Sequence, residues 1–136
     1  MKKVKFIYNP FSGEREILKY LDYIINAYQK NNYVIVPFRI SYNVNLEEAF
    51  IDVDSSYDHI LISGGDGTVN QIVNIIKNKN LNIPIAVLPA GTANDFAHVI
   101  GMPHSIRQSV DMILKSSPKF IDLGKVNDKY LSLIHI

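Results

Sequence analysis

The chain has 136 residues, a formal net charge of +1 and no cysteine. That length allows one compact domain with its own core, but not comfortably two. The near-neutral charge gives no argument for nucleic acid as a partner, and without cysteine there is no disulfide framework or thiolate metal site. No apolar run approaches the roughly 20 residues of a membrane-spanning helix, and the first strand begins without a signal-peptide segment. We therefore expect a cytoplasmic domain.

Short apolar strands alternate with amphipathic helices along the first part of the chain. A first strand is predicted at residues 4–8. Apolar residues then recur at helical spacing from about 13 to 30, with Ser12 as the candidate N-cap. Residues 33–40 are rich in β-branched and aromatic side chains and are predicted to form a second strand. Pro37 favours an edge position for that strand, because proline cannot donate a ladder hydrogen bond.

The same alternation continues to the end of the chain. Strands that are apolar throughout and alternate with helices favour a mostly parallel sheet with helices on both faces. The expected fold class is therefore α/β, a three-layer α/β/α arrangement. The further elements that we expect are a weak helix at 45–51, a strand at 59–62, a helix through 69–76, a strand at 85–88, a short helix at 93–100, a helix at 105–115 and an extended segment at 120–123.

The strongest polar loop lies between a buried strand and a helix, at the edge of the sheet where such folds bind ligands. Its glycines let the backbone approach a ligand closely, and the N-terminus of the following helix suits phosphate. A carboxylate beside phosphate is repulsive unless a cation lies between them, so Asp66 implies Mg²⁺ or a tightly bonded structural role. The alternative is a tight turn in which Thr68 and Gln71 form a capping box. The loop comprises Gly64, Gly65, Asp66, Gly67, Thr68 and, in the first helical turns, Asn70.

Two further loops follow predicted strands. The one after residues 85–88 again offers a turn glycine, a hydroxyl and a carboxylate, and it too could be only a capping box. The loop after the first strand, taken alone, favours an ordinary strand-to-helix turn. Asp122 is an acid between two apolar residues, and it either is an exposed strand residue or points at the same metal. The candidate residues of the two loops are Gly91, Thr92, Asn94 and Asp95 in one and Asn9, Ser12 and Gly13 in the other.

Together these motifs resemble the catalytic domain of the diacylglycerol kinase family, which includes sphingosine kinases and bacterial lipid kinases. The family pattern Asn-Pro-x-Ser/Ala-Gly matches residues 9–13, and Gly-Gly-Asp-Gly-Thr matches residues 64–68. Gly-Thr-x-Asn-Asp-Phe-Ala matches residues 91–97, and Ile-Asp-Leu-Gly matches residues 121–124. The resemblance covers about the first 130 residues. The glycine motif is shared with NAD kinases, whereas the Gly-Thr-x-Asn-Asp-Phe element is typical of the lipid kinases.

The resemblance implies transfer of the ATP γ-phosphoryl group to a lipid hydroxyl, with Mg²⁺. It implies catalytic roles for Asp66 and Asp95, and a metal-linked network of Asp66, Asp95 and Asp122. Ser41 stands near the place where the family often has threonine at the nucleotide edge. The residues implied in nucleotide binding are Asn9, Ser12, Gly13, Ser41, Gly64, Gly65, Asp66, Gly67, Thr68, Asn70, Gly91, Thr92 and Asn94.

The resemblance also implies parts that this chain lacks. Residues 1–130 correspond to the nucleotide-binding domain, whereas the C-terminal β-sandwich domain of the family, with the general base and part of the lipid site, is absent. We therefore expect the chain to bind ATP weakly and to catalyse little. Residues 131–136 match the translation of a sequencing adapter, and we interpret them as a non-native tail; the alternative is a native β-strand.

The expected partners are ATP, a lipid acceptor and, during catalysis, a transient membrane surface. A homodimer is one option for the oligomeric state, and no nucleic acid is expected. Two other functions stay open on the sequence. One is a small-molecule kinase resembling NAD kinase, which uses the same glycine loop. The other is a non-catalytic nucleotide-binding module.

Overall fold

A computed structural model gives the structure of the chain and describes residues 1–88, 105–116, 118–122 and 131–135. The elements in chain order are β1 (Lys2–Tyr8), η1 (Gly13–Tyr20), α1 (Leu21–Lys30), β2 (Tyr33–Arg39), η2 (Leu46–Phe50), β3 (Tyr57–Ser63), α2 (Asp66–Asn78), β4 (Ile85–Leu88), α4 (Ile106–Lys115), β5 (Pro118–Asp122) and β6 (Leu131–His135), where η denotes a 3₁₀-helix.

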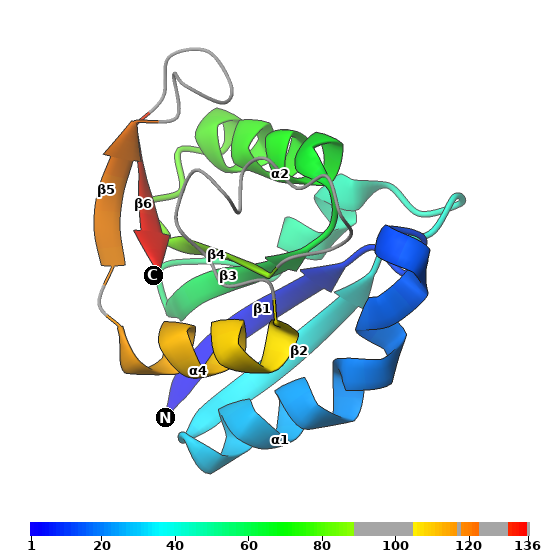
Figure 1. Cartoon of the computed structure of the whole chain (residues 1–136). Coiled ribbons are helices and arrows are strands. Elements are labelled where there is room, and N and C mark those ends of the chain that lie inside the picture. Colours follow the sequence, from blue (N-terminus) through cyan, green and yellow to red (C-terminus); the bar gives the residue numbers. More distant parts are fainter. Residues whose placement is uncertain (89–104, 117, 123–130, 136) are drawn as a thin grey trace.

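The strands form one sheet in the order β2-β1-β3-β4-β6-β5. Neighbouring strands are parallel, except that β5 runs antiparallel to β6. Helix α2 covers one face, and α1 and α4 cover the other (Figure 1). The expected three-layer α/β/α fold is confirmed. Strand β2 lies at an edge of the sheet, as its proline predicts, because Pro37 pairs with β1 and with no second strand among the described residues.

The apolar residues of the central strands make the core. All four residues of β4 are buried, and β3 is buried from His59 to Ser63. Because side chains alternate along a strand, His59, Leu61 and Ser63 point to the same face. His59 contacts Tyr28 of α1, so this is the face that α1 covers. Ile60 and Ile62 therefore point to the opposite face.

The first helical segment differs from the expectation. Residues 13–30 do not form one α-helix: a 3₁₀-helix runs to Tyr20, and the α-helix begins at Leu21. Arg15 has a φ of 62°, in the left-handed region, and a regular right-handed helix cannot pass through such a residue. Ser12 does occupy the N-cap position, but its side chain makes no capping hydrogen bond.

Three other features expected from the sequence, two helices and a capping box, compare with the structure as follows. The weak helix at 45–51 is a 3₁₀-helix, with a capping box between Asn45 and Glu48. A capping box of Thr68 and Gln71 is wrong, because α2 already begins at Asp66 and Thr68 lies inside its first turn. The short helix expected at 93–100 lies outside the described residues.

Candidate functional site

The carboxyl ends of β1, β2 and β3 meet at one edge of the sheet. The N–H of Asn9 donates to the carbonyl oxygen of Ser63 over 2.7 Å, which joins the loop after β1 to the end of β3. The N–H of Ile40 donates to the carbonyl of Tyr8 over 2.9 Å, which joins the end of β2 to β1 in the same way. These hydrogen bonds therefore hold the starts of the three loops side by side.

The side chain of Asn9 links two of these loops. Its Oδ1 accepts from the N–H of Phe11 over 2.9 Å, which closes a turn within the first loop. Its Nδ2 donates to Oγ1 of Thr68 over 3.4 Å, in the first turn of α2. Asn9 therefore contacts the first turn of α2 directly, and Ser12 follows in the same loop, with its N–H donating to the carbonyl of Asn9.

The glycines of the loop between β3 and α2 are favoured for different local reasons. Gly65 is the N-cap of α2 in an extended conformation, and Asp66 is the first helical residue. A Cβ on Gly64 would lie 2.8 Å from the side chain of Thr68, so only glycine fits there. A Cβ on Gly65 or Gly67 would meet no described atom within 4 Å. The backbone is thus exposed to a ligand at the N-terminus of a helix, which is the arrangement that suits an anion.

The residue just before this loop carries a buried polar atom. Ser63 is fully buried, and its Oγ has no hydrogen-bond partner among the residues that the structure describes. An unpaired buried hydroxyl typically costs about 1–3 kcal/mol. An unsatisfied group of this kind needs a partner such as a water molecule or an ion, or a functional role.

The remaining candidates in the described part of the chain lie at the same edge or close to it. Asn70 is half-buried in α2, two residues after Thr68. Gly13 is the first residue of η1. Ser41 follows β2, and its Oγ accepts from Nη1 of Arg39 over 3.0 Å. The Ser41 hydroxyl therefore already has a protein partner at the rim of the site.

Asp122 does not join this group. It ends β5, where it pairs with Leu131, the first residue of β6. Because β5 runs antiparallel to a strand that is itself parallel to β4, its carboxyl end lies at the opposite end of the sheet from the glycine loop. The strand arrangement therefore gives no support to a metal shared by Asp66 and Asp122. Four other candidates lie outside the described residues: Gly91, Thr92, Asn94 and Asp95.

Sequence reasoning missed a set of side chains beside the first loop, which we call the aromatic–arginine cluster: Phe11, Arg15, Arg39 and Tyr42. The rings of Phe11 and Tyr42 stack with centroids 4.8 Å apart. The guanidinium groups of Arg15 and Arg39 lie over the Phe11 ring, 5.7 and 5.5 Å from its centroid. Phe11 and Tyr42 lie in two different loops, whereas Arg15 belongs to η1 and Arg39 ends β2, so no periodicity in the sequence signals that they meet.

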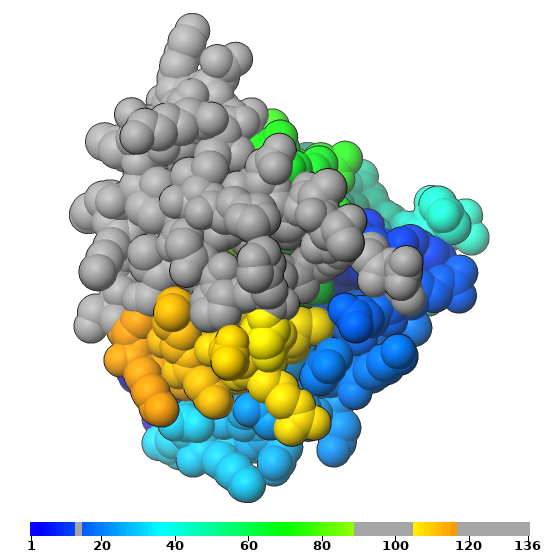
Figure 2. All heavy atoms as spheres, in the orientation of Figure 1, coloured from blue at the N-terminus to red at the C-terminus, as the bar shows by residue number. Residues whose placement is uncertain are grey.

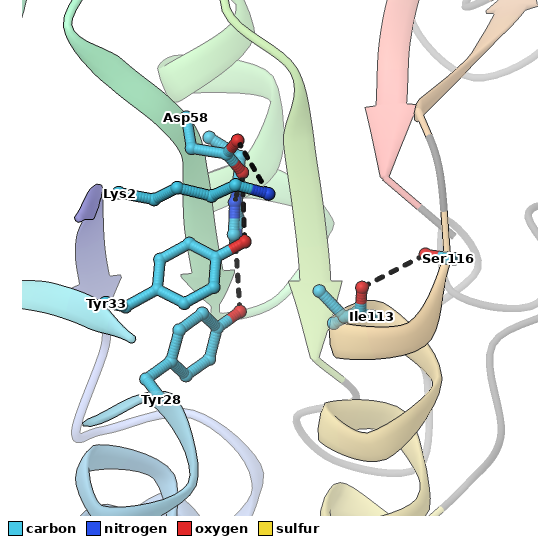
Figure 3. Close-up of polar contacts among 7 residues, drawn as sticks. Lys2, Tyr28, Tyr33, Asp58, Ile113 and Ser116 are labelled. Atoms are coloured by element: carbon cyan, nitrogen blue, oxygen red, sulfur yellow. Dashed lines mark hydrogen bonds and ion pairs between the residues drawn. The ribbon is translucent and has the colours of Figure 1, made fainter. Parts of the chain in front are cut away.

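A second polar group lies at the opposite end of the sheet, away from the loops (Figure 3). The buried His59 lies between Tyr28, whose hydroxyl is 2.9 Å from Nε2, and Asp58, whose carboxylate is 2.7 Å from Nδ1. Tyr33 donates to the same carboxylate over 3.2 Å, and Lys2 lies 3.9 Å from it. Burial lowers the pKa of His59, and the hydrogen bond from His59 lowers the pKa of Asp58.

The described residues offer neither a cluster of metal ligands nor a helix that could span a membrane. No group of three or more histidine, cysteine, aspartate or glutamate side chains there could hold a metal ion. None of the helices found there is long and apolar enough to cross a membrane. Asp66 thus supplies a carboxylate at the candidate site without a described acidic cluster around it.

The fold and the site define an α/β domain whose parallel sheet presents a glycine loop and a helix N-terminus at its carboxyl edge. The sequence pattern of the diacylglycerol kinase catalytic domain matches residues 3–126. The chain belongs to this family, and the resemblance found in its motifs is confirmed.

Relatives and solved structures agree with this assignment. A diacylglycerol kinase of Staphylococcus aureus (strain bovine RF122 / ET3-1) is 29% identical over 133 residues, covering 95% of this chain and 41% of the relative. A diacylglycerol kinase of Staphylococcus saprophyticus is 28% identical over 130 residues, covering 95% of this chain and 43% of the relative.

A crystal structure of a diacylglycerol kinase from Bacillus anthracis str. Sterne superposes with a TM-score of 0.76 and 26% identity, covering 89% of this chain and 42% of that chain. A putative diacylglycerol kinase from the same organism superposes with a TM-score of 0.77, covering 41% of that chain. This chain therefore spans less than half of the length of the relatives that it matches.

Proposed function

We propose that this chain is the nucleotide-binding part of an ATP-dependent lipid kinase, which transfers the ATP γ-phosphoryl group to a lipid hydroxyl. Membership of the diacylglycerol kinase catalytic family supports the reaction class. The observation that carries the proposal is the contact of Asn9 with Thr68, which fastens the first loop to the first turn of α2. A kinase needs such a fixed cradle, because phosphoryl transfer depends chiefly on positioning and charge stabilisation.

The residues of the glycine loop fit an ATP phosphate and a magnesium ion. The space beside Gly65 and Gly67 is open, so a phosphate group could approach the backbone closely there. The N–H groups at the start of a helix point outward along its axis, so those of the first turn of α2 would donate to phosphate oxygens. The Asp66 carboxylate begins that turn and would repel phosphate unless a cation lay between them, so Asp66 is the residue that would hold Mg²⁺. When bound, the ion neutralises phosphate charge.

The chain alone is proposed to bind nucleotide weakly and to catalyse little. It covers 41% of the length of its S. aureus relative, and the acceptor must be held in line with the nucleotide for transfer. We place the acceptor site and the general base outside this chain. The proposed location is cytoplasmic, with contact to the membrane surface during catalysis.

Calorimetric titration with ATP, with and without Mg²⁺, tests the proposal. The intact chain should bind ATP only when Mg²⁺ is present, and Asp66→Ala should abolish the Mg²⁺-dependent part. Asp22→Ala is the matched control, since Asp22 is an exposed acid in the first turn of another helix, α1. Normal folding without any ATP binding, or equal binding by Asp66→Ala, would contradict the proposed role of the glycine loop.

A further inference from the structure

A continuous series of hydrogen bonds passes through the buried His59, at the end of the sheet away from the candidate site (Figure 3). The carboxylate of Asp58 accepts from the hydroxyl of Tyr33 and lies 2.7 Å from Nδ1 of His59. A carboxylate only accepts hydrogen bonds, so Nδ1 carries the ring proton. In the neutral ring Nε2 is then an acceptor, and the hydroxyl of Tyr28, 2.9 Å away, donates to it. Both nitrogens of the neutral ring thus have a partner of the right kind.

Aromatic rings and only a few charges surround His59. The Tyr33 ring meets the His59 ring edge-on, with centroids 5.5 Å apart, and Tyr28 and His59 are both fully buried. The charged groups that act on His59 are Asp58 on its own strand and Lys2 on β1, whereas α1 and β2 present the two tyrosines. Burial lowers the pKa of His59, and Asp58 acts in the opposite direction.

A second proton on His59 would disturb one of its two hydrogen bonds. Both nitrogens of a cationic ring are donors. Nδ1 would keep its partner, because Asp58 still accepts from it. Nε2 would become a donor that faces the Tyr28 hydroxyl, which must then turn to accept, and the structure gives its own proton no other acceptor among the described residues. The contact that is lost therefore joins α1 to the sheet, and the contacts among the strands remain.

The last turn of α1 depends on this contact more than the rest of the helix does. Earlier in the helix, α4 lies against η1 and α1 (Figure 2), and the hydroxyl of Tyr23 donates to Asp111 over 3.3 Å. The guanidinium group of Arg107 also lies over the Tyr23 ring. Tyr28 is the last buried residue before the helix ends at Lys30. It is therefore the anchor of the last turn.

We propose that Tyr28 and His59 form an acid-sensitive latch, which fastens the last turn of α1 to β3 at neutral pH and releases it when His59 takes up a proton. The helix leads back through η1 to the loop of residues 9–12, so acid would loosen the support of the first loop of the candidate site. The latch needs no nucleotide and is independent of the proposed function.

Proton linkage gives the sign and the size of the effect. In the released state the ring of His59 meets water and its pKa returns to about 6.5, whereas burial holds the pKa lower in the closed state. The released state therefore binds the extra proton, and release becomes more favourable as the pH falls below about 6.5. Between pH 7 and pH 5.5 the equilibrium constant for release should rise several-fold, with an upper limit of about eight-fold.

Native-state hydrogen–deuterium exchange of the whole chain, at pH 7 and at pH 5.5, tests the latch. After correction for the intrinsic effect of pH on exchange, the amides of residues 28–30 should lose protection several-fold at the lower pH. They should also exchange faster than the amides of residues 60–62 in β3, because the helix end opens without global unfolding. Equal protection of the two segments at pH 5.5 would overturn the latch, since α1 would then leave only when the whole chain unfolds.

Two variants and a matched control identify the groups. His59→Gln offers an N–H to Asp58 and a carbonyl to Tyr28 but does not titrate, so its last turn should keep its protection at pH 5.5. Tyr28→Phe removes the donor to His59 and should lower the protection several-fold already at pH 7. Tyr23→Phe is the control: it makes the same change on the same helix, where the partner is Asp111 and not a histidine, and it should lose protection on acidification as the unaltered chain does.

The variants can also refute the latch. A loss in His59→Gln as large as that in the unaltered chain would overturn it, and so would equal behaviour of the two tyrosine variants, which decides the matter if His59→Gln does not fold. Nitrogen-15 NMR of the histidine rings adds a readout of the hydrogen bonds themselves. The His59 signals, absent from His59→Gln, should show the proton on Nδ1 at pH 7. A proton on Nε2 would contradict the latch, because Tyr28 would then already be the acceptor.

Discussion

Gly64 and Gly67 lie three residues apart, one before helix α2 and one in its first turn, and an added methyl group should have opposite effects on stability at the two positions. A Cβ at Gly64 would lie 2.8 Å from the side chain of Thr68, whereas one at Gly67 meets no described atom within 4 Å. Gly64→Ala should therefore lower the free energy of unfolding by about 1–3 kcal/mol. Gly67→Ala, inside a helix, should raise it by about 0.5–1 kcal/mol. Urea denaturation measures both.

The clash at Gly64 has a specific rescue. Thr68→Ala removes the atoms that the new methyl group would meet, so adding it to Gly64→Ala should recover part of the lost stability. A double-mutant cycle would then give a coupling free energy between the two positions. Additive losses would show that the cost of Gly64→Ala comes from the backbone instead.

His59 gives the stability of the chain a dependence on pH. It is fully buried and its pKa lies below the ordinary value of 6.5, chiefly because burial disfavours the charged form. The unfolded chain therefore binds a proton near pH 6.5 that the folded chain does not, and the free energy of unfolding falls as the pH drops below that value. The slope from this group approaches about 1.4 kcal/mol per pH unit.

Denaturation of the unaltered chain and of His59→Gln, at pH 7 and at pH 5, measures this effect. The variant should lose less stability over that interval, whatever its absolute stability, because the difference between the two chains isolates His59 from the other histidines. Asp58, whose pKa is lowered below 3.8 chiefly by the hydrogen bond from His59, contributes only at more acidic pH. Identical slopes for the two chains would mean that His59 is protonated in the folded state.

At the scale of single elements, the end of α2 shows a Schellman motif. Asn80 has a φ of 53°, its N–H donates to the carbonyl of Lys77, and the N–H of Leu81 donates to the carbonyl of Ile76. Glycine adopts this left-handed conformation with less strain than asparagine. Asn80→Gly should therefore raise the free energy of unfolding by about 0.5–1 kcal/mol, as measured by thermal or urea denaturation.

Asn78 is the matched position for this change. It is the last residue of α2, exposed, and in a right-handed conformation. Asn78→Gly should lower the stability by a few tenths of a kcal/mol, because glycine loses more backbone entropy in a helix. A loss of stability in both variants would show that the asparagine side chain at position 80, and not its backbone angle, matters for the helix end.

The elements differ in how far they could be predicted. Apolar strands and the edge position of Pro37 follow from side-chain type alone, and the predicted strands match β1 to β4 within two residues at each end. The break between η1 and α1 could not be foreseen, because it depends on the left-handed angle of Arg15 and not on the spacing of apolar residues. The position of Asp122 depends on the insertion of β6 between β4 and β5, which no local pattern encodes.

The candidate site, too, could be predicted only in part. The glycine loop could be recognised because its chemistry is contiguous in the sequence. The contact of Asn9 with Thr68 joins residues 59 positions apart and emerges only once the sheet aligns the strand ends. The aromatic–arginine cluster was missed for the same reason, since Phe11 and Tyr42 belong to different loops.

At the scale of the whole molecule, β6 has a structural position that its composition does not reveal. Residues 131–135 lie between β4 and β5, and β6 is the strand that pairs with β5. Its interpretation as a non-native tail stays a prediction. Removing residues 131–136 should lower the free energy of unfolding by at least about 2 kcal/mol, because β5 loses its hydrogen-bond partner and one side of β4 is uncovered.

Urea denaturation of residues 1–130 and of the full chain measures this loss. A chain that lacks only residue 136 is the control, because it keeps all of β6, and it should unfold at the same urea concentration as the full chain. Equal midpoints for residues 1–130 and the full chain would mean that β6 adds no stability.

The parallel pairing of β1 with β3 also has a kinetic consequence. The first and second loops of the candidate site meet only after strands separated by more than 50 residues have aligned, as the register of Val4 with His59 requires. Long-range pairing of this kind is slow compared with local helix formation, because loop closure precedes any gain from the contacts. The binding cradle should therefore be among the last parts of the chain to form during refolding, after its helices. ATP binding followed in stopped flow should lag behind the recovery of helical circular dichroism.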